Sequence, residues 1–326
     1  MLIRRALCAA LLGVFVGAVQ AQAAPPATNY PTQPIRMVLP LSPGTTTDLV
    51  ARMFGERLGQ LLGQPVIIDN RPGAGGTLAA QAVAKAPADG YTILLVNSQH
   101  AINPAAHVSL PYDTLRDFTG LAMVAEAPSV IAVSRELGVN TLAEFVALAK
   151  KKPGSINYGS AGVGSQTHLA GAYFASKAGI QLTHVPYRSG SDVISDFVTN
   201  RIQSVFVPAP FVMGHIKDGK VKALAVTGPS RLPQLPNVPT VAESAIPGYN
   251  LTTWFGFVAP AKTPAPIAAL LAKTFKAIAE EPDIKQKFLE QGLTTRILVQ
   301  RDFDALIKSE VERLGPIAKT VGVDAK

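Results

Sequence analysis

The sequence predicts an α/β protein of about two domains with mainly parallel sheets, and three observations lead to that prediction. The chain has 326 residues, which is more than a single hydrophobic core usually supports. Hydrophobic residues make up 48% of the chain and charged residues 16%, below the roughly 25% usual in soluble domains, which indicates extensive buried surface. Apolar segments of strand length also alternate with helical patterns, as is typical of parallel sheets.

The first alternation spans residues 35–97. Residues 35–41 form an apolar run that ends in turn and N-cap residues, and the following segment repeats apolar side chains at spacings of three and four up to Leu62. A strand at 66–68, a glycine-rich loop, an alanine-rich helix and a strand at 91–97 follow. This order of strands and helices predicts a parallel sheet.

The second alternation covers residues 120–227. It predicts strands at 120–133, 156–158, 183–185, 204–207 and 222–227, and helices at 141–151, 165–178, 192–199 and 210–218. Five prolines in residues 228–250 exclude long regular elements there and predict a connecting segment. A helix that starts near Pro264 and ends at Glu280, and a terminal helix around 303–314, complete the chain.

The first 23 residues have the pattern of a signal peptide. A short basic segment is followed by an apolar run at 6–19 and by the small residues Ala21 and Ala23, so we expect export with cleavage near Ala23. A membrane anchor is the alternative, but about 14 apolar residues are short of the roughly 20 that a spanning helix needs. Cleavage would remove Cys8, the only cysteine, and lower the formal net charge from +8 to +6. We therefore expect a protein outside the cytoplasm, without disulfides.

The charge pattern and the enzyme motifs exclude several functions. Lys and Arg are scattered, so the basic excess predicts no nucleic-acid partner and favours encounter with small anions. Residues 214–220 imitate a phosphate-binding loop, but Val221 stands where Ser or Thr is needed. The five histidines lack the spacing of a metal site. We expect neither a metal nor a cofactor.

Two loops are candidates for binding an anion. Each follows a predicted strand, is rich in Gly, Ser and Thr, and opens a helix whose first amides carry partial positive charge. The first consists of Ser42, Pro43, Gly44, Thr45, Thr46, Thr47 and Asp48, and the second of Ser160, Ala161, Gly162, Val163, Gly164, Ser165, Gln166 and Thr167. Ordinary turns with N-caps are the alternative for either loop alone. The pair suggests two domains that grip one anion.

Ser160 also raises the alternative of an exported serine hydrolase. Its surroundings, residues 158–162, do not match the G-x-S-x-G nucleophile elbow, because the preceding glycine is one residue too near. His168 and His184 could act as the base only if the fold placed and oriented one of them, which spacing alone does not show. Capping or ligand hydrogen bonding is the favoured role for Ser160.

Many short motifs in order along the chain resemble the substrate-binding receptors of tripartite tricarboxylate transporters, the Bug or TctC-like family. The motifs are YPTQPIR (30–36), GQPV (63–66), NRPGAGG (70–76), ADGYT (88–92), INP (102–104), LPYD (110–113), NYGSAG (157–162), HVPYR (184–188), ALAVT (223–227), VPTVAES (238–244) and AP (259–260). The resemblance runs nearly from end to end.

The resemblance implies a two-lobed periplasmic binding protein of type II, a Venus flytrap. It implies a first lobe of residues 24–124 plus 227–326, a second lobe of 125–226, and hinge crossings near Val124 and Val226. Such a receptor closes on a small organic carboxylate and docks on the membrane permease subunits. The alternative function is that of an exported ligand sensor that acts through a two-component system. We expect the protein to be a monomer.

The resemblance also implies site residues. The two loops match the family's carboxylate-binding loops, Asn97, Ser98 and His100 occupy a strand end that faces the cleft, and Tyr187, Pro208 and Ala209 belong to the wall of the second lobe. This chain departs from the family at Thr45, where many relatives carry glycine, and at Gln203–Ser204 and Val207–Pro208, where relatives often carry aspartate. An apolar wall with few acidic groups favours a hydrophobic or aromatic carboxylate over an amino acid. The ligand expected overall is a di- or tricarboxylate or an aromatic acid. Asp48 could accept from an ammonium group, although helix capping is its favoured role.

Overall fold

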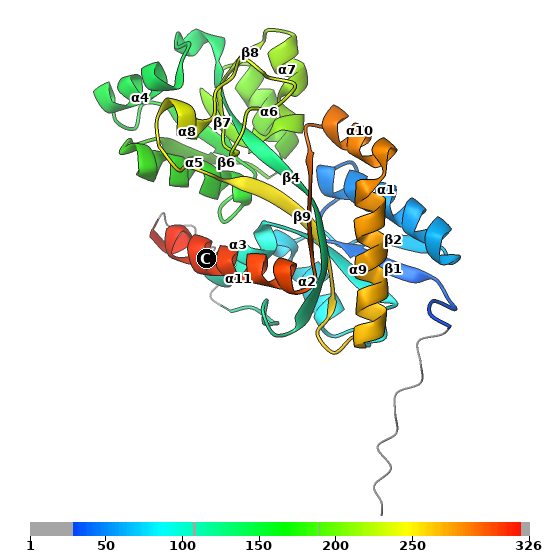
Figure 1. Ribbon diagram of the computed structural model, residues 1–326. Helices are drawn as coiled ribbons and strands as arrows, with labels where there is room; N and C mark the ends of the chain where they lie inside the picture. The colour runs from blue at the N-terminus through cyan, green and yellow to red at the C-terminus, as the bar shows by residue number, and fades with distance from the viewer. Residues whose placement is uncertain (1–28, 107–108, 189, 321–326) are drawn as a thin grey trace, which may run out of the picture.

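The computed structural model describes residues 29–106, 109–188 and 190–320, and the predicted signal peptide lies outside this part of the chain. Two α/β lobes lie side by side (Figure 1). The long strand β4 (Phe118–Ser134) runs through both, so the strands form one continuous path in the order β2-β1-β3-β9-β4-β7-β5-β6, with β8 and β10 also paired to β4. None of the described helices is long and apolar enough to cross a membrane.

Lobe 1 contains the first alternation and the C-terminal part of the chain. Its strands are β1 (Ile35–Leu39), β2 (Val66–Asn70), β3 (Thr92–Asn97), β9 (Thr252–Pro260) and β10 (Thr294–Val299). Its helices are α1 (Thr46–Leu62), η1 (Ala74–Gly76), α2 (Thr77–Ala84), α3 (Gln99–Ala106), α9 (Ala265–Glu280), α10 (Pro282–Glu290) and α11 (Arg301–Thr320).

Lobe 2 contains the second alternation. Its strands are β5 (Asn157–Ser160), β6 (Thr183–Pro186), β7 (Ser204–Pro208) and β8 (Val221–Val226). Its helices are η2 (Arg135–Leu137), α4 (Leu142–Lys151), α5 (Gln166–Ala178), α6 (Gly190–Val198), η3 (Ala209–Phe211), α7 (Met213–Lys217) and α8 (Val241–Ser244).

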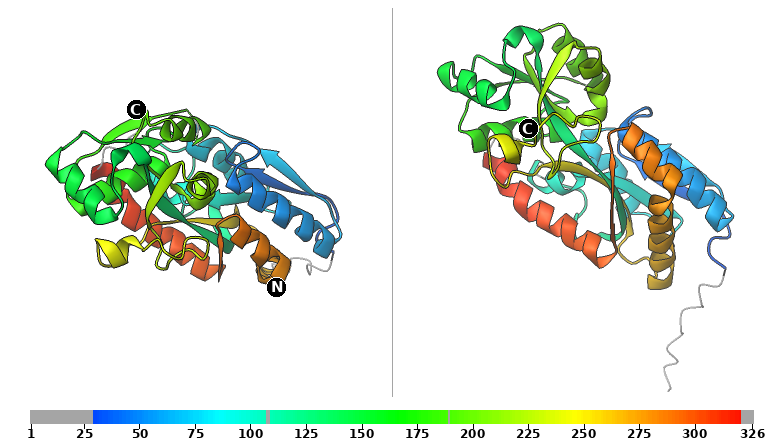
Figure 2. Two further views of the ribbon diagram at one scale, coloured as in Figure 1. Left: turned by 90° about the horizontal axis from the view of Figure 1, so that it is seen from above. Right: turned by 45° about the horizontal axis from the view of Figure 1, so that its top comes forward.

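The central strands β3, β4, β7 and β9 are buried on both faces, which explains why they are apolar without alternation. In lobe 2, for example, Ile131 and Val133 of β4 pack with α4 and α5, whereas Val130 and Ala132 pack with α6 and η3. In lobe 1, α1 and α9 cover one face, and α2 and α11 cover the other. Figures 1 and 2 show α11 leaving lobe 1 and ending against lobe 2, where Leu314 joins the core that includes α5.

Three chain segments meet where the lobes join. β4 pairs with β9 up to Pro128 and with β7 from Ser129 onward. Thr227, which follows β8, is fully buried and bonds both neighbours: its Oγ1 accepts from the Ser129 amide at 2.8 Å and donates to the Leu251 carbonyl at 2.5 Å. The predicted lobe limits near Val124 and Val226 stay a prediction, and this pairing pattern places the exchange of partners at residues 128–129 of β4.

The α/β fold class is confirmed, and the sheet is mixed. The outer strands of each lobe, β1 with β2 and β3 and β5 with β6 and β7, are parallel, as helix crossovers predict. Strands β4, β8, β9 and β10 pair antiparallel, because the chain passes out along β4 and back along β9. No strand after residue 227 was predicted from the sequence. The apolar residues of β9 form a continuous run, and such a run has no periodicity that distinguishes a buried strand from a buried helix.

Candidate functional site

The first predicted loop leads directly into α1, and its own side chains cap the helix. Thr45 Oγ1 accepts a hydrogen bond from the Asp48 amide at 3.3 Å and donates to the Ser42 carbonyl at 3.0 Å. The amides of Thr46 and Thr47 occupy the first two helical positions, where no preceding turn supplies a carbonyl acceptor. The loop therefore presents amide donors at the positive end of a 17-residue helix.

Asp48 holds this loop in shape. Its carboxylate accepts hydrogen bonds from the Gly44 amide at 3.0 Å, from Arg52 at 2.9 and 3.1 Å, and from Asn70 at 3.1 Å, and the residue is only 4% exposed. Four donors use most of the acceptor capacity of a carboxylate. These contacts support a structural role for Asp48 in the cap of α1 and leave little capacity for the ammonium group of an amino acid.

We expect Asp48 to stabilise the fold fully above about pH 4 and progressively less at lower pH. Burial raises the pKa of Asp48, but the hydrogen bonds from Arg52, Gly44 and Asn70 outweigh burial and hold the pKa below its usual value. Because the folded pKa is the lower one, the stabilisation is complete above about pH 4, the pKa of an unfolded aspartate, and is lost as the pH falls through the folded pKa. The gap in melting temperature between wild type and Asp48→Asn should therefore shrink below about pH 4. A gap that stays constant in acid would contradict this role.

The second predicted loop leads into α5 and folds back on its first turn. Ser165 Oγ accepts from the His168 amide at 3.2 Å and donates to the Gly162 carbonyl at 2.7 Å. Thr167 Oγ1 accepts from the Ala161 amide at 3.0 Å. These bonds fix the loop internally, so that its shape does not depend on a bound molecule.

Donors remain at the start of α5. Gln166 and Thr167 occupy its first two positions, where no carbonyl of a preceding turn is available to their amides. The side-chain nitrogen of Gln166, Nε2, is shielded from water and has no hydrogen-bond partner among the described residues. A buried donor without a protein partner is costly and is free to bond an ordered water or a bound acceptor. Val163, at the tip of the loop, is 50% exposed and adds an apolar surface beside these donors.

A layer of rings packs behind the second loop. His184 Nε2 lies 2.6 Å from Ser160 Oγ, the His184 ring stacks on His168 with centroids 3.8 Å apart, and the Tyr158 ring lies 5.0 Å away. Burial, together with the proximity of His168, lowers the pKa of His184 to about 4, so His184 is neutral at physiological pH. The layer therefore supports the loop without adding charge.

The contact between Ser160 and His184 is one that the hydrolase alternative requires. The Ser160 hydroxyl, however, is buried and is also bonded to the Gly162 peptide, accepting from its amide and lying 3.1 Å from its carbonyl. Among the described residues, no carboxylate is hydrogen-bonded to His184 to orient it. These contacts shape the loop.

A chain of hydrogen bonds connects the two loops through the start of α3. Asn97 Nδ2 donates to Thr47 Oγ1 at 3.4 Å, and Asn97 Oδ1 accepts from the Gln99 amide at 3.0 Å. Gln99 Nε2 then donates to the Gly164 carbonyl of the second loop at 3.0 Å. The fold thus brings together two loops that are more than 100 residues apart in the sequence.

Gln99 was missing from the residues predicted from the sequence, although a signal was present. It follows the polar strand end Asn97–Ser98 directly and is the first residue of α3. A long amide side chain at that position can reach beyond its own lobe, whereas Asn97 serves the first loop.

Two other predicted residues lie in the core of lobe 1. Ser98 is 2% exposed, and its Oγ accepts from the Trp254 amide at 2.9 Å, which joins β3 to β9. His100 is 4% exposed; its ring stacks on Tyr112 and meets Phe118 edge-on, and burial lowers its pKa to about 4. These contacts tie the start of α3 to the sheet.

The predicted wall residues of lobe 2 border the second loop and lobe 1. The Tyr187 amide donates to the Ser160 carbonyl at 2.9 Å. Pro208 ends β7 opposite Ser129. Ala209 is fully buried at the start of η3, and Gly292 of lobe 1 approaches it so closely that a β-carbon at residue 292 would lie 3.3 Å from the Ala209 β-carbon.

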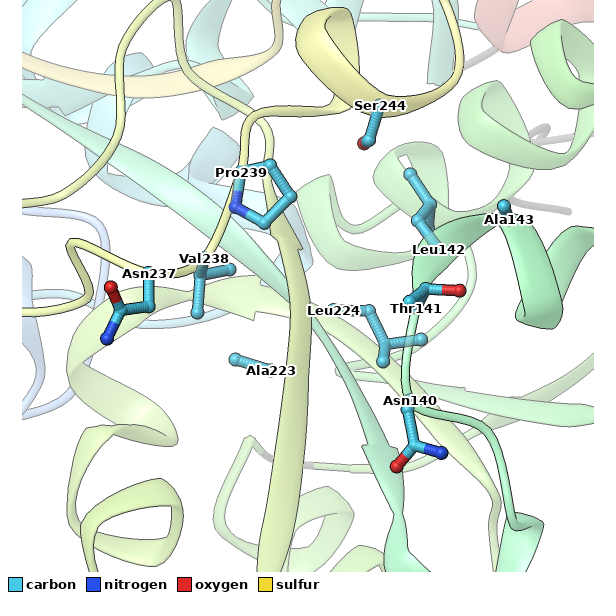
Figure 3. Close-up of a pocket in the computed structure, with 10 residues that line it drawn as sticks. All are labelled: Asn140, Thr141, Leu142, Ala143, Ala223, Leu224, Asn237, Val238, Pro239 and Ser244. Atoms are coloured by element: carbon cyan, nitrogen blue, oxygen red, sulfur yellow. The ribbon is translucent and has the colours of Figure 1, made fainter.

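Two cavities lie away from both loops. One of about 290 Å³ opens in lobe 2 and is lined by Asn140, Thr141, Leu142, Ala143, Ala223, Leu224, Asn237, Val238, Pro239 and Ser244 (Figure 3). The other, of about 350 Å³, lies between α3, residues 110–115 and α11. Neither is lined by a residue of the two loops, so the candidate anion site rests on hydrogen-bond geometry and not on an enclosed cavity.

Comparison with known proteins gives consistent matches. The family model described as tripartite tricarboxylate transporter family receptor matches residues 50–323. A protein encoded in the tcbD-tcbE intergenic region of a Pseudomonas species is 36% identical over 312 residues, covering 95% of this chain and 92% of the relative.

Solved structures agree over similar lengths. A protein from R. palustris solved with adipate is 33% identical with a TM-score of 0.82, covering 90% of this chain and 98% of its own. The periplasmic binding protein BugD is 30% identical with a TM-score of 0.80, covering 91% of this chain and 100% of its own. MatC from Rhodopseudomonas palustris with bound malate is 28% identical with a TM-score of 0.76, covering 88% and 99%.

Proposed function

This chain belongs to the receptor family of tripartite tricarboxylate transporters, and from that premise we propose that it captures a small organic carboxylate between its two loops and delivers it to the membrane subunits of such a transporter. Members of the family are periplasmic solute-binding proteins and not enzymes, and the chain has their two-lobed fold. The hydrolase alternative is therefore not retained. We propose that the protein acts as a monomer.

The observation that carries the proposal is the meeting of two capped helix starts. Thr45 caps α1, Ser165 caps α5, and the chain through Asn97 and Gln99 joins the two loops. Each start supplies amide donors and partial positive charge, and Gln166 adds a buried donor that has no partner in the described chain. A carboxylate has the charge and the acceptor geometry that such donors favour.

The surroundings of the donors support an acid without an ammonium group. The one acidic side chain in the two loops, Asp48, is already bonded to Arg52, Gly44 and Asn70. The exposed Val163 offers apolar contact. The two relatives solved with adipate and with malate hold dicarboxylates. We therefore propose a di- or tricarboxylate, or a hydrophobic or aromatic acid, as the ligand.

Closure would take place where the three chain segments meet. We propose that the hinge lies at residues 128–129 of β4, at Thr227 and at Leu251, because β4 exchanges its partner strands there and Thr227 bonds the other two segments. A ligand that contacts both lobes favours the closed arrangement by its differential affinity.

A thermal-shift screen tests the ligand class. We propose that the exported protein begins at Ala24. The mass of the protein isolated from the periplasm would check this start. This protein is expected to gain stability with one class of carboxylate, by about 2.7 kcal/mol at 100 times the dissociation constant, which is enough to raise the melting temperature by several degrees.

The matched carboxamides and the amino acids serve as controls in that screen. Neutral amides lack the charge that the helix starts favour, so they are expected to give no shift. Stabilisation by aspartate or glutamate but not by adipate, malate or benzoate would contradict the proposed ligand class. Equal shifts with acid and amide would contradict the anion site itself.

A further inference from the structure

One side chain of lobe 1 is bonded directly to the anion loop of lobe 2. Gln99 Nε2 donates to the Gly164 carbonyl at 3.0 Å and also to Asn103 Oδ1 at 2.9 Å. We call the bond from Gln99 to Gly164 the interlobe bridge. It joins residues that are 65 positions apart and belong to different lobes.

The lobe 1 end of the bridge is held firmly. Asn103 is 2% exposed, and its Nδ2 donates to the Gly75 carbonyl at 3.1 Å and to Tyr112 Oη at 3.3 Å. The backbone amide of Gln99 also donates to Asn97 Oδ1. The donor of the bridge is therefore fixed by lobe 1 and does not hang free from the first turn of α3.

The lobe 2 end of the bridge lies in the anion loop itself. The Gly164 amide lies 3.3 Å from His168 Nδ1, to which it donates, and its carbonyl accepts from Gln99, so both sides of this residue are bonded. A carbonyl oxygen near a bound carboxylate repels it, and the bridge engages that oxygen in a hydrogen bond to lobe 1. The bridge thus fixes the position of the Gly164 carbonyl relative to lobe 1 and favours the approach of the lobes.

We propose that Gln99 is a positioning residue that sets the affinity of the receptor: its bridge to Gly164 holds the second anion loop against lobe 1 and favours the closed arrangement. This inference rests on the proposed function, because the loop that it positions is the one proposed to bind the carboxylate. Gln99 controls affinity through closure and not through a charge of its own.

Gln99→Met tests the bridge because methionine has a similar length and shape but no hydrogen to donate. The variant loses the bridge and also the bond to Asn103, which lies within lobe 1. The dissociation constants for adipate and benzoate are expected to rise about three- to tenfold, the effect of losing the one neutral hydrogen bond that crosses between the lobes. The rise should come from faster dissociation, since the bridge forms only when the lobes have approached. Titration calorimetry and stopped-flow displacement measure the two quantities.

Gln286→Met is the matched control. Gln286 also donates to a residue four positions further along its helix, Glu290 at 3.1 Å, but it lies on α10 and is bonded within lobe 1 alone. This variant loses a side-chain bond at the same helical spacing, here to an exposed carboxylate, without losing a bridge. We expect wild-type affinity and dissociation rate for it.

Interlobe distance gives a readout that does not depend on the ligand. Spin labels on cysteines introduced at the exposed Leu61 of α1 and Lys151 of α4, in the protein that begins at Ala24 and has no other cysteine, report the separation of the lobes. Gln99→Met should increase the longer-distance population relative to Gln286→Met. Equal distance distributions and equal dissociation constants in the two variants would overturn the inference.

The two proposals fail in different ways. If wild type binds no carboxylate but Gln99→Met still separates the lobes, the bridge stands and the proposed function fails. If wild type binds adipate or benzoate but Gln99→Met behaves like Gln286→Met in both measurements, the function stands and the bridge fails.

Discussion

Thr46→Asp is expected to weaken carboxylate binding at least about 100-fold while the melting temperature stays unchanged or rises slightly. Thr46 is the first residue of α1, and its amide is one of the donors proposed to hold the ligand. Two unit charges about 5 Å apart repel each other by roughly 3 kcal/mol at an effective dielectric constant of about 20, and this is the repulsion expected between a carboxylate at residue 46 and a ligand carboxylate held by the neighbouring amides. Negative charge in the first turn favours the helix, so the loss of binding would not come from unfolding.

Ala265→Asp is the control for that variant. Ala265 is exposed and is the first residue of α9, so the substitution adds the same charge at the same helical position, in the same lobe but outside the two loops. Calorimetric titration with the acid found in the thermal-shift screen measures both variants. We expect wild-type binding for Ala265→Asp. Equal loss of binding in both variants would mean that net charge, and not the start of α1, controls affinity.

Gly171→Ala is expected to destabilise the protein by about 1–3 kcal/mol, the usual cost of overpacking a core. Gly171 lies in α5, where replacing glycine by alanine would ordinarily gain up to about 1 kcal/mol. A β-carbon at this position, however, would lie 2.3 Å from the ring of Tyr158, which is only 3% exposed. The ring is buried and cannot move away cheaply, so packing reverses the sign of the helix propensity.

The same substitution should also weaken ligand binding, because Tyr158 packs against His184, which is bonded to Ser160 of the second loop. Gly214→Ala is the matched control: Gly214 is an exposed glycine in α7, and a β-carbon there would meet no atom within 4 Å. Thermal unfolding should show a lower melting temperature for Gly171→Ala and an unchanged or higher one for Gly214→Ala. A higher melting temperature for Gly171→Ala would show that Tyr158 can shift without cost.

The parts of the site that lie close together in the sequence were predictable. Thr45 and Ser165 cap α1 and α5 as their positions between a strand and a helix predict, because capping involves only residues within three positions of each other. The role of Asp48 could be predicted only as far as helix capping. Its further bond to Asn70 joins residues that are 22 positions apart.

The placement of Ser98 and His100 could not be predicted from their neighbours. Both follow the end of β3, and a resemblance placed them beside the cleft. In the structure, Ser98 bonds Trp254 of β9, and His100 packs between Tyr112 and Phe118. These contacts depend on which strand lies next to β3, and the sequence indicated no strand at residues 252–260.

The sequence by itself determined the fold class, the parallel outer strands of each lobe, the two capped loops and the family, because these follow from local periodicity, capping residues and short motifs. Only the tertiary structure decided the antiparallel strands β9 and β10, the packing of Tyr158 on Gly171 and the bridge from Gln99 to Gly164. The physical reason is that hydrogen bonds and packing between distant segments depend on where the whole chain places them. No pattern within a single element encodes that placement.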